Sequence, residues 1–377
     1  MVKVKIQKIK LRRMQLELKD PFQTSFGTQT EREFILVEVY GDHHVGYGEC
    51  VVTSKPLYNE ETVKTAWHIM EDFLIPILYE HNEIHHPDKV RELFKPIRRN
   101  NMAKAALEGA IWDLYAKEKN ITLSRALGGN KDVIEVGISI GIQETTDELI
   151  SVVGKYVNKG YKRIKIKIKP GQDVSTLRKV REVFPHIRMM ADANSAYTLD
   201  DVEVFKELDK LNLMMIEQPL SHDDIVDHAK LQSVINTPIC LDESIHSLDD
   251  ARKAIELGSC KIINIKIGRV GGLTESKKIH DYCEIHGIPV WCGGMLESGV
   301  GRAHNIAITS LSNFILPGDT ASSSRYWYED IISPEVIVEK GLIKIPHLPG
   351  IGYSPQESLL DKYTLERKVL FRDQYVV

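Results

Sequence analysis

The chain has 377 residues, of which 42% are hydrophobic, and its 49 basic and 53 acidic residues give a formal net charge of −4. Because charges of both signs are mixed along the chain, we expect no large basic face and therefore no nucleic-acid or anionic-membrane partner. No apolar run reaches the length of about 18 residues that suggests a membrane helix, and the N-terminus carries charges throughout, so we expect a cytoplasmic globular protein.

The first part of the chain, up to about residue 125, contains strand-like runs followed by helical windows. Runs over residues 2–18, 31–41 and 43–52 predict strands, and windows over 59–80 and 100–120 predict helices. Trp112 and Tyr115 in the second helical window are expected in the core. Strands followed by helices are typical of an α+β unit.

Residues 19–31, "KDPFQTSFGTQTE", predict a mobile loop, because Gly27 and several Thr and Ser residues interrupt two strands. Phe22 and Phe26 in this loop are candidate contacts for an apolar ring of a ligand. Core packing is the more common role for a Phe beside a strand, and it stays open for both residues. Tyr58, in "KPLYNEET", is a weaker candidate for the same site.

From the run "VIEVGISIG" to about residue 320, short apolar runs alternate with amphipathic helical windows, which is typical of a parallel βα sheet. The apolar runs end at regular intervals of 25, 25, 25 and 24 residues, at Lys167, Asp192, Glu217, Asp242 and Lys266. The same interval extends back to Ser139 and forward to Gly293 and Gly318. Eight such units predict a closed parallel barrel whose chemistry lies at the C-terminal ends of the strands.

The stretch "RIKIKIKPG", Arg163 to Gly171, alternates basic and apolar residues with the period of a strand. In a barrel, Ile164 and its apolar neighbours face the outer helices, so Lys165 and Lys167 point into the interior near the mouth. Buried amines are costly there unless anions accompany them. The alternative is an edge strand whose lysines face solvent, and the regular spacing to the other strand ends argues against it.

Three acids, Asp192, Glu217 and Asp242, end successive predicted strands and should converge on one side of the barrel mouth. Carboxylates in that position repel one another unless a cation joins them. Oxygen ligands without Cys or His favour Mg²⁺ over zinc, and Mn²⁺ can substitute. Each acid taken alone could instead be an ordinary strand-end residue or helix N-cap.

Two lysines, Lys167 and Lys266, end the second and sixth of the eight predicted strands, nearly opposite each other. Amines on opposite faces of a bound substrate suit removal and return of a proton at carbon. Nearby Mg²⁺ and neighbouring lysines should lower the amine pKa toward neutrality, as a general base requires. The metal would stabilise the enediolate formed next to a carboxylate.

The segment "GGMLESGVG" follows the seventh predicted strand, and Gly293 would let the backbone approach a ligand while Met295 forms an adaptable apolar wall. A tight turn into the next helix is an equally open interpretation. Ser139, on the first predicted strand, is a weaker candidate. The chain has five widely spaced cysteines outside any CxxC pattern, which we expect to be reduced and mostly buried.

Together, the motifs "IKIKIKPG", "MADANSAY", "MMIEQPL", "CLDES", "INIKIGRVGGL" and "WCGGMLESGVGRAHNIA" resemble those of the enolase superfamily. The chain is most similar to the o-succinylbenzoate synthase / N-acylamino acid racemase family of the muconate-lactonizing subgroup, and the likeness covers nearly the whole chain. It implies an α/β fold: a (β/α)7β TIM-like barrel over residues 129–325, an α+β capping domain over 1–128, and a C-terminal segment, 326–377, that returns to the capping domain.

The resemblance also implies roles for individual residues. Lys167 matches the base on one face of the substrate and Lys266 the amine on the other, while Lys165 matches a lysine thought to tune Lys167. Asn194 and Glu243 occupy positions beside the metal ligands. The acids Asp192, Glu217 and Asp242 match the Mg²⁺ ligands, and no departure from the family is found at any of these positions.

The activity implied by the resemblance is Mg²⁺-dependent dehydration of 2-succinyl-6-hydroxy-2,4-cyclohexadiene-1-carboxylate to o-succinylbenzoate, a step of menaquinone biosynthesis. The alternative is racemisation of N-succinylamino acids, in which both lysines exchange the α-proton. Dipeptide epimerisation is a third possibility, although "LPGDTASSS" offers only Asp319 where such epimerases tend to carry Asp-x-Asp. A non-catalytic barrel is a remote fourth. The substrate is a small carboxylate in each catalytic case, and the resemblance suggests a homo-oligomer.

Overall fold

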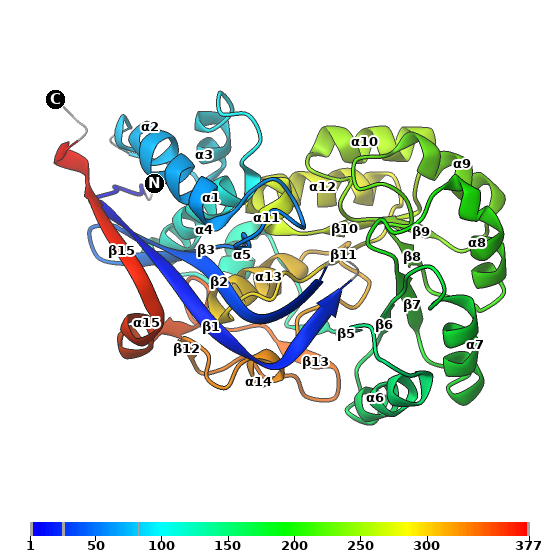
Figure 1. Cartoon of the computed structure of the whole chain (residues 1–377). Coiled ribbons are helices and arrows are strands. Elements are labelled where there is room, and N and C mark those ends of the chain that lie inside the picture. Colours follow the sequence, from blue (N-terminus) through cyan, green and yellow to red (C-terminus); the bar gives the residue numbers. More distant parts are fainter. Residues whose placement is uncertain (1–2, 25–26, 82, 375–377) are drawn as a thin grey trace.

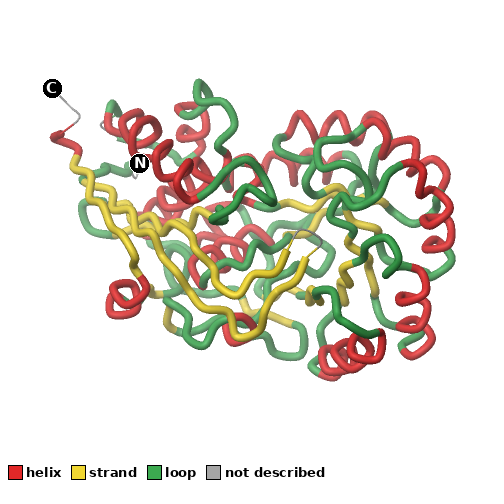
Figure 2. The backbone as a smooth tube through the Cα atoms, viewed as in Figure 1, coloured by secondary structure: helices red, strands yellow, loops and turns green. Residues whose placement is uncertain are grey.

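Two sheets organise the chain in the computed structural model, which describes residues 3–24, 27–81 and 83–374 (Figure 1). One is a four-stranded antiparallel sheet in the order β15-β1-β2-β3, and the other is a seven-stranded parallel sheet in the order β11-β10-β9-β8-β7-β6-β5. Figure 2 shows helices around the outside of the parallel strands, while the antiparallel strands run as long extended ribbons beside them. The expected enolase-like architecture is confirmed.

The antiparallel sheet joins the two ends of the chain, since β15 pairs with β1 from Lys8↔Phe371 to Met14↔Thr364. Its strands are β1 (Lys8–Thr24), β2 (Gly27–Tyr40), β3 (Val45–Cys50) and β15 (Thr364–Phe371). The helices of the same region are α1 (Val63–Ile69), the π-helical turn η1 (Met70–Leu74), α2 (Ile75–Tyr79), α3 (Asp88–Leu93), α4 (Asn101–Glu118) and α5 (Leu123–Leu127).

Strand β3 lies directly on the buried helix α4, and two glycines permit this contact. A Cβ atom on Gly46 would lie 2.0 Å from the carbonyl oxygen of Ala110, and one on Gly48 would lie 2.0 Å from that of Ala106. These distances leave no room for any side chain. Trp112 and Tyr115 on α4 are buried in the core, as predicted.

The segment predicted as a loop, residues 19–31, is instead the end of a β-hairpin. Strands β1 and β2 pair as far as Thr24↔Gly27, with a register shift between Glu17 and Phe22. The Thr-rich sequence suits extended backbone, so cross-strand pairing overrides the turn signals. In Figure 1 the C-terminal end of β1 and the N-terminal end of β2 lie toward the barrel strands. Phe26 lies outside the described residues.

The parallel strands are short, and their ends follow the predicted spacing. They are β5 (Ile138–Ile140), β6 (Ile164–Lys167), β7 (Met189–Asp192), β8 (Ile216–Glu217), β9 (Ile239–Leu241), β10 (Ile262–Ile265) and β11 (Val290–Cys292). The helices that follow them are α6 (Thr146–Asn158), α7 (Val174–Val183), η2 (Leu199–Asp201), α8 (Val202–Asp209), α9 (Val226–Val234), α10 (Leu248–Leu257), α11 (Ile267–Val270), α12 (Leu273–Ile285) and α13 (Gly299–Thr309).

The eighth predicted strand, ending at Gly318, is present only as a bridging segment. The amide of Asp319 donates to the carbonyl of Cys292 over 2.9 Å, and the amide of Gly137 donates to the carbonyl of Gly318 over 2.7 Å. This segment therefore connects β11 to the entrance of β5 without forming a strand in the described chain. Pro317 just before it has no backbone N–H to donate, which limits the pairing.

The remaining elements are the short strand β4, which precedes the barrel, and the helices and strands of the C-terminal part of the chain. They are β4 (Val133–Glu135), α14 (Ser323–Tyr326), β12 (Ile332–Ser333), β13 (Leu342–Lys344), β14 (Ser354–Pro355), α15 (Glu357–Tyr363) and η3 (Arg372–Gln374). Strand β13 pairs with β4, and β12 pairs with β14.

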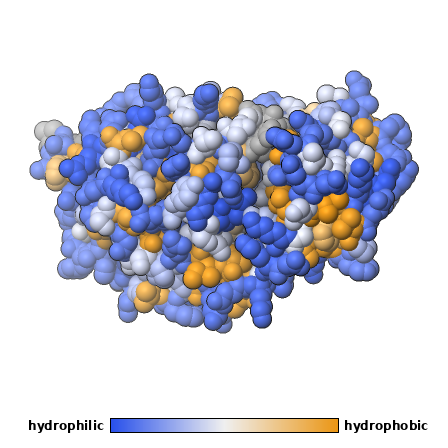
Figure 3. Space-filling model, turned by 60° about the horizontal axis from the view of Figure 1, so that its bottom comes forward, coloured by the Kyte–Doolittle hydropathy of each residue, from blue (hydrophilic) through white to orange (hydrophobic). Residues whose placement is uncertain are grey.

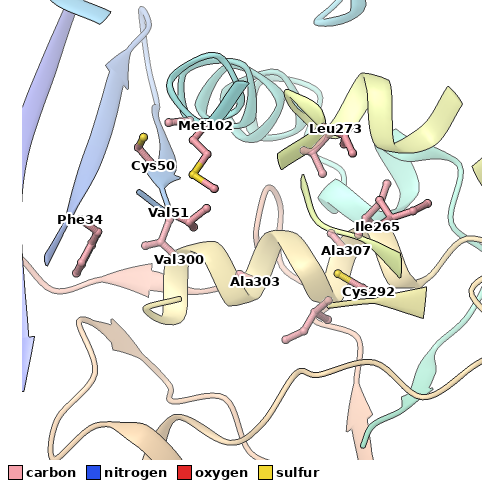
Figure 4. Packing of buried hydrophobic residues seen from close by; sticks show 14 of the residues in the cluster. Phe34, Cys50, Val51, Met102, Ile265, Leu273, Cys292, Val300, Ala303 and Ala307 are labelled. Atoms are coloured by element: carbon pink, nitrogen blue, oxygen red, sulfur yellow. The ribbon is translucent and has the colours of Figure 1, made fainter. Parts of the chain in front are cut away.

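A continuous apolar core joins the antiparallel sheet to the barrel. Figure 4 shows Val51 and Met102 from the N-terminal region beside Val300 and Ala303 of α13. All five cysteines are free and buried, as predicted. On the face shown in Figure 3, hydrophilic residues predominate around smaller apolar patches. Within the described residues, no helix has both the length and the apolar character needed to cross a membrane.

Replacing Gly48 with Ala should lower the free energy of unfolding by about 3 kcal/mol, the upper range for an overpacked core, because the new methyl group meets a backbone carbonyl that cannot move aside. The matched control is Gly154→Ala on α6, where the nearest contact would be 3.4 Å from Phe184 and helix propensity predicts a gain of up to about 1 kcal/mol. Urea unfolding, followed by circular dichroism, measures the free energy of unfolding of both variants. Equal urea midpoints for the two variants would contradict the close packing of β3 on α4.

Candidate active site

The C-terminal ends of β6 to β10 bring together the three predicted acids and the three predicted lysines. Asp192 and Glu217 are the last residues of β7 and β8, and Asp242 directly follows β9. All three carboxylates are buried. Lys165 is also buried, which confirms that this strand turns its lysines into the barrel and not toward solvent.

Lys165 lies at the centre of a buried network of opposite charges. Its ammonium is 2.7 Å from Asp319, 3.1 Å from Glu217 and 3.2 Å from Asp192, and it lies 5.0 Å from the centre of the Trp291 ring. Burial alone would lower the pKa of Lys165, but the three carboxylates together outweigh it and raise this pKa.

Lys167 is held at the mouth of the barrel by Asp192 and Asn194. Its ammonium is 2.6 Å from the Asp192 carboxylate and also donates to the Asn194 side-chain oxygen. Asn194 in turn donates to Glu243 over 2.9 Å, and its backbone has a φ of 42°, a left-handed conformation that Asn tolerates better than most residues. These contacts fix the direction of the Lys167 amine.

Lys266 directly follows β10 and contacts groups from both parts of the molecule. Its ammonium is 2.7 Å from Asp242 and donates to the Tyr58 hydroxyl over 3.2 Å, and it lies 4.7 Å from the centre of the Tyr58 ring. A Cβ atom on Gly293 would lie 2.8 Å from Cε of Lys266, so the glycine leaves space for this lysine. Tyr58 and Gly293, predicted as ligand contacts, therefore both contact Lys266.

The lowering of the amine pKa expected for Lys167 and Lys266 beside Mg²⁺ stays a prediction, and the protein's own groups raise the pKa of Lys266 as they do that of Lys165. Burial lowers the pKa of Lys266, but Tyr58, Glu243 and the other carboxylates raise it by more. The physical reason is that these ammonium groups are themselves the cations that neutralise the buried acids.

The acids differ in their partners. Burial opposes ionisation of Asp192, but Lys167 and Lys165 lower its pKa below the usual range. Burial together with the nearby Asp192 charge raises the pKa of Glu217, which accepts a 2.6 Å hydrogen bond from Asn264. Asp242 forms ion pairs with Lys266 and Arg269.

The sharing of one cation by Asp192, Glu217 and Asp242 stays a prediction. In the part of the chain that the structure describes, no three His, Cys, Asp or Glu side chains form a ready-made metal cage. Lysine and arginine side chains contact the carboxylates instead: Lys165 lies beside Asp192 and Glu217, and Asp242 pairs with Lys266 and Arg269.

The donor set nevertheless fits a divalent cation. Its ligands would be carboxylate oxygens alone, which suits Mg²⁺ or Mn²⁺. Oε2 of Glu243 is buried without a hydrogen-bond partner among the described residues, so it can accept a cation without breaking a contact. The two side-chain oxygens of Asp242 face Lys266 and Arg269, and a bound cation would replace these partners.

A cavity of about 450 Å³ opens above these groups, between the β1–β2 hairpin, the segment after β3 and the strand ends. Both Lys167 and Lys266 face it, so the two amines reach one space from opposite strands. Its wall includes the predicted contacts Phe22, Tyr58, Asn194 and Met295. Ser139 and Gly293 are not part of this wall, and the buried Ser139 hydroxyl has no hydrogen-bond partner in the described chain.

Three site residues were missed from the sequence: Asp319, Arg163 and Asn264. Asp319 is buried and forms 2.7 Å ion pairs with both Lys165 and Arg163. Its position directly after Gly318, the last point of the 25-residue spacing, was an available signal. Asn264 lies on β10, two residues before Lys266, and this spacing places both side chains on the inner face.

Two family models match this chain: "Mandelate racemase / muconate lactonizing enzyme, N-terminal domain" over residues 6–128 and "Enolase C-terminal domain-like" over residues 148–359. The chain is 60% identical to an o-succinylbenzoate synthase of Geobacillus kaustophilus over 98% of both chains. It is 45% identical to an N-succinylamino acid racemase of Thermus thermophilus, over 97% of this chain and 99% of the relative. A solved structure of an enolase-superfamily member from Listeria innocua matches with a TM-score of 0.95 and 43% identity, over 98% of this chain and all of the other.

Replacing Asp319 with Asn should destabilise the fold by about 3–5 kcal/mol, because Lys165 and Arg163 would remain buried with one partner fewer. The matched control is Asp20→Asn, which removes an ion pair to Arg325 from a side chain that is 75% exposed and should change stability by less than about 1 kcal/mol. Thermal unfolding compares the two variants. Similar melting temperatures would show that Asp319 does not hold the buried cations.

Proposed function

The chain belongs to the mandelate racemase / muconate lactonizing enzyme family of the enolase superfamily, and from this premise we propose that it is an o-succinylbenzoate synthase. The reaction is dehydration of 2-succinyl-6-hydroxy-2,4-cyclohexadiene-1-carboxylate, a step of menaquinone biosynthesis. The observation that carries the proposal is the pair of lysines, Lys167 and Lys266, that face one cavity from opposite strands above buried carboxylates.

The proposed dehydration needs one amine that acts first as a base and then as an acid. Lys167 removes the proton next to the substrate carboxylate, and the resulting ammonium returns that proton to the departing hydroxyl group, so that water leaves and the ring becomes aromatic. Asp192 and Asn194 hold the amine in position through both steps. Lys266, on the other face, contributes a fixed positive charge that favours the anion formed between them.

We propose that Asp192, Glu217 and Asp242 hold Mg²⁺, with Mn²⁺ able to substitute. Enzymes of this superfamily generally use Mg²⁺. When bound, the cation supplies positive charge that stabilises negative charge on the substrate carboxylate. The oxygen-only donor set and the buried Oε2 of Glu243 beside it, which has no hydrogen-bond partner among the described residues, support this assignment.

Racemisation of N-succinylamino acids is the second candidate activity. It needs a base on each face of the α-carbon, and Lys266 meets this requirement because its amine lies at the same cavity as Lys167. Tyr58 orients that amine through its hydroxyl and ring. The same site therefore supports both reactions, and they differ in whether Lys266 acts as a charge or as a base.

We further propose the organisation in which this site works. Residues 1–128 and 326–377 form a cap over the barrel of residues 129–325, and the β1–β2 hairpin closes the cavity. A cytoplasmic location is supported by five buried cysteines without disulfides. A homo-oligomer is the form that family likeness suggests.

Removing divalent metal with EDTA should abolish dehydration, and Mg²⁺ or Mn²⁺ should restore it. Glu217→Gln should weaken Mg²⁺ binding, measured by calorimetry, at least about tenfold because a charged ligand is lost. The control is Glu256→Gln, on a side chain that is 56% exposed outside the site. Full activity of the metal-stripped enzyme would contradict the proposed cation, and unchanged Mg²⁺ affinity in the Glu217 variant would exclude that ligand.

The two lysines can be separated by Lys266→Arg, which keeps the charge but cannot serve as a base, since the pKa of Arg is above about 12. We expect measurable dehydration but no racemisation in this variant, whereas Lys167→Ala should lose dehydration by about 10²–10⁴-fold or more. Lys261→Arg, on the exposed surface, is the control.

Exchange with D₂O locates the face on which each lysine acts. Wild-type enzyme should exchange the α-proton of both enantiomers of an N-succinylamino acid, and Lys266→Arg should exchange only the enantiomer whose proton faces Lys167. Equal exchange of both enantiomers by the variant would show that the assignment of the two faces is wrong.

A further inference from the structure

Both substrates of the proposed function carry a succinyl group, and therefore a second carboxylate remote from the reacting carbon. Lys167 and Lys266 act at the carbon that loses its proton, so this remote carboxylate needs other partners. The cavity extends beyond the two lysines to a wall formed by the segment after β3, including Thr53, Ser54 and Lys55. A cation in this wall would be well placed to receive it.

Lys55 is the cation that this wall offers. Its side chain is exposed, and its ammonium forms no ion pair or hydrogen bond with the described residues. The ammonium of Lys167 or Lys266, by contrast, lies within 2.7 Å of a carboxylate. Lys55 is therefore available to a ligand without giving up an existing partner.

Hydrogen bonds hold the backbone at Lys55 in place, while its ammonium has no partner among the described residues. The Thr53 hydroxyl donates to the Lys55 carbonyl over 2.5 Å, and the Leu57 amide donates to the same carbonyl over 2.9 Å. Just upstream, the buried guanidinium of Arg32 donates to the carbonyls of Val51 and Val52. A positioned backbone reduces the ordering cost when the side chain binds an anion.

Among the described residues, the β2 part of the wall offers no competing exposed cation. Glu31 and Glu33 face the cavity, and each already has a polar partner. Arg32, between them in sequence, is buried, and the nearby buried Glu49 offsets part of its charge. Lys55 is therefore the exposed cation to which an anionic group can bind at this wall.

We propose that Lys55 binds the remote carboxylate of the succinyl group and selects succinyl-bearing substrates over acetyl-bearing ones. This inference rests on the proposed function, because it assumes that the α-carbon lies between Lys167 and Lys266. It applies to dehydration and to racemisation alike, since both substrates share the succinyl group.

The test is Lys55→Gln, compared for an N-succinylamino acid and the N-acetyl form of the same amino acid. We expect kcat/KM for the succinyl substrate to fall about tenfold, mainly through KM, because a hydrogen bond to a charged group is lost. The value of kcat/KM for the N-acetyl substrate should not change. Lys55→Arg should retain most of the preference, and Lys64→Gln, an exposed lysine on α1 that does not face the cavity, is the matched control.

Equal changes for the succinyl and acetyl substrates, or no change for either, would overturn the role of Lys55 while leaving the proposed function intact. Calorimetry with o-succinylbenzoate and benzoate keeps the test decisive if the wild type turns over neither substrate. We expect Lys55→Gln to weaken binding of o-succinylbenzoate about tenfold and to leave benzoate unchanged. Wild-type enzyme that binds both compounds equally would also contradict the inference.

Discussion

The structure depends on the neutralisation of charge inside the barrel mouth. Lys165, Lys167 and Lys266 are each within 2.7 Å of a carboxylate that is itself almost fully buried. A buried charge without a partner costs several kcal/mol, so removing any one of these groups alone should destabilise the fold. The same constraint explains why Asp319, outside the predicted set, is needed beside Lys165. Catalytic and structural roles therefore overlap, and a variant at this site must be tested for folding as well as for activity.

Buried carboxylates also join the cap to the barrel. Here glutamates of the cap accept hydrogen bonds from the first backbone amides of two barrel helices. Glu108 of α4 accepts from the amides of Leu273 and Thr274 at the start of α12, and Glu49 of β3 accepts from those of Ser298 and Gly301 at the start of α13. A carboxylate satisfies amides that have no partner within the helix and complements the helix dipole. These contacts fix the cap over the strand ends, so Tyr58 can meet Lys266 across 208 residues of sequence.

Patterns of nearby residues predicted the features that nearby residues determine, namely where strands end and which way their side chains point. The 25-residue spacing located the strand ends, and the alternation around Lys165 showed which way it points. Contacts between distant segments could not be read in this way: the Tyr58 hydroxyl meets Lys266 because the cap lies over the barrel, and Asp319 reaches Lys165 from a segment that never becomes a strand. Only residues 19–31 of the β1–β2 hairpin were predicted as a loop, because the turn signals there are local while the pairing that extends both strands is made between them.

The barrel and the cap contribute different kinds of groups to the cavity. The barrel supplies groups whose positions are fixed by mutual neutralisation, and these suit a reaction at carbon that is common to several substrates. The cap supplies Phe22, Lys55 and Tyr58, which face the cavity from segments that carry no proposed metal ligand or base. Substitutions of Phe22 or Lys55 can therefore change which acyl group or ring is accepted without touching the buried charges, whereas Tyr58 also contacts Lys266. If the proposed role of Lys55 holds, one charge network serves both dehydration and racemisation, and a separate wall of the same cavity selects the substrate.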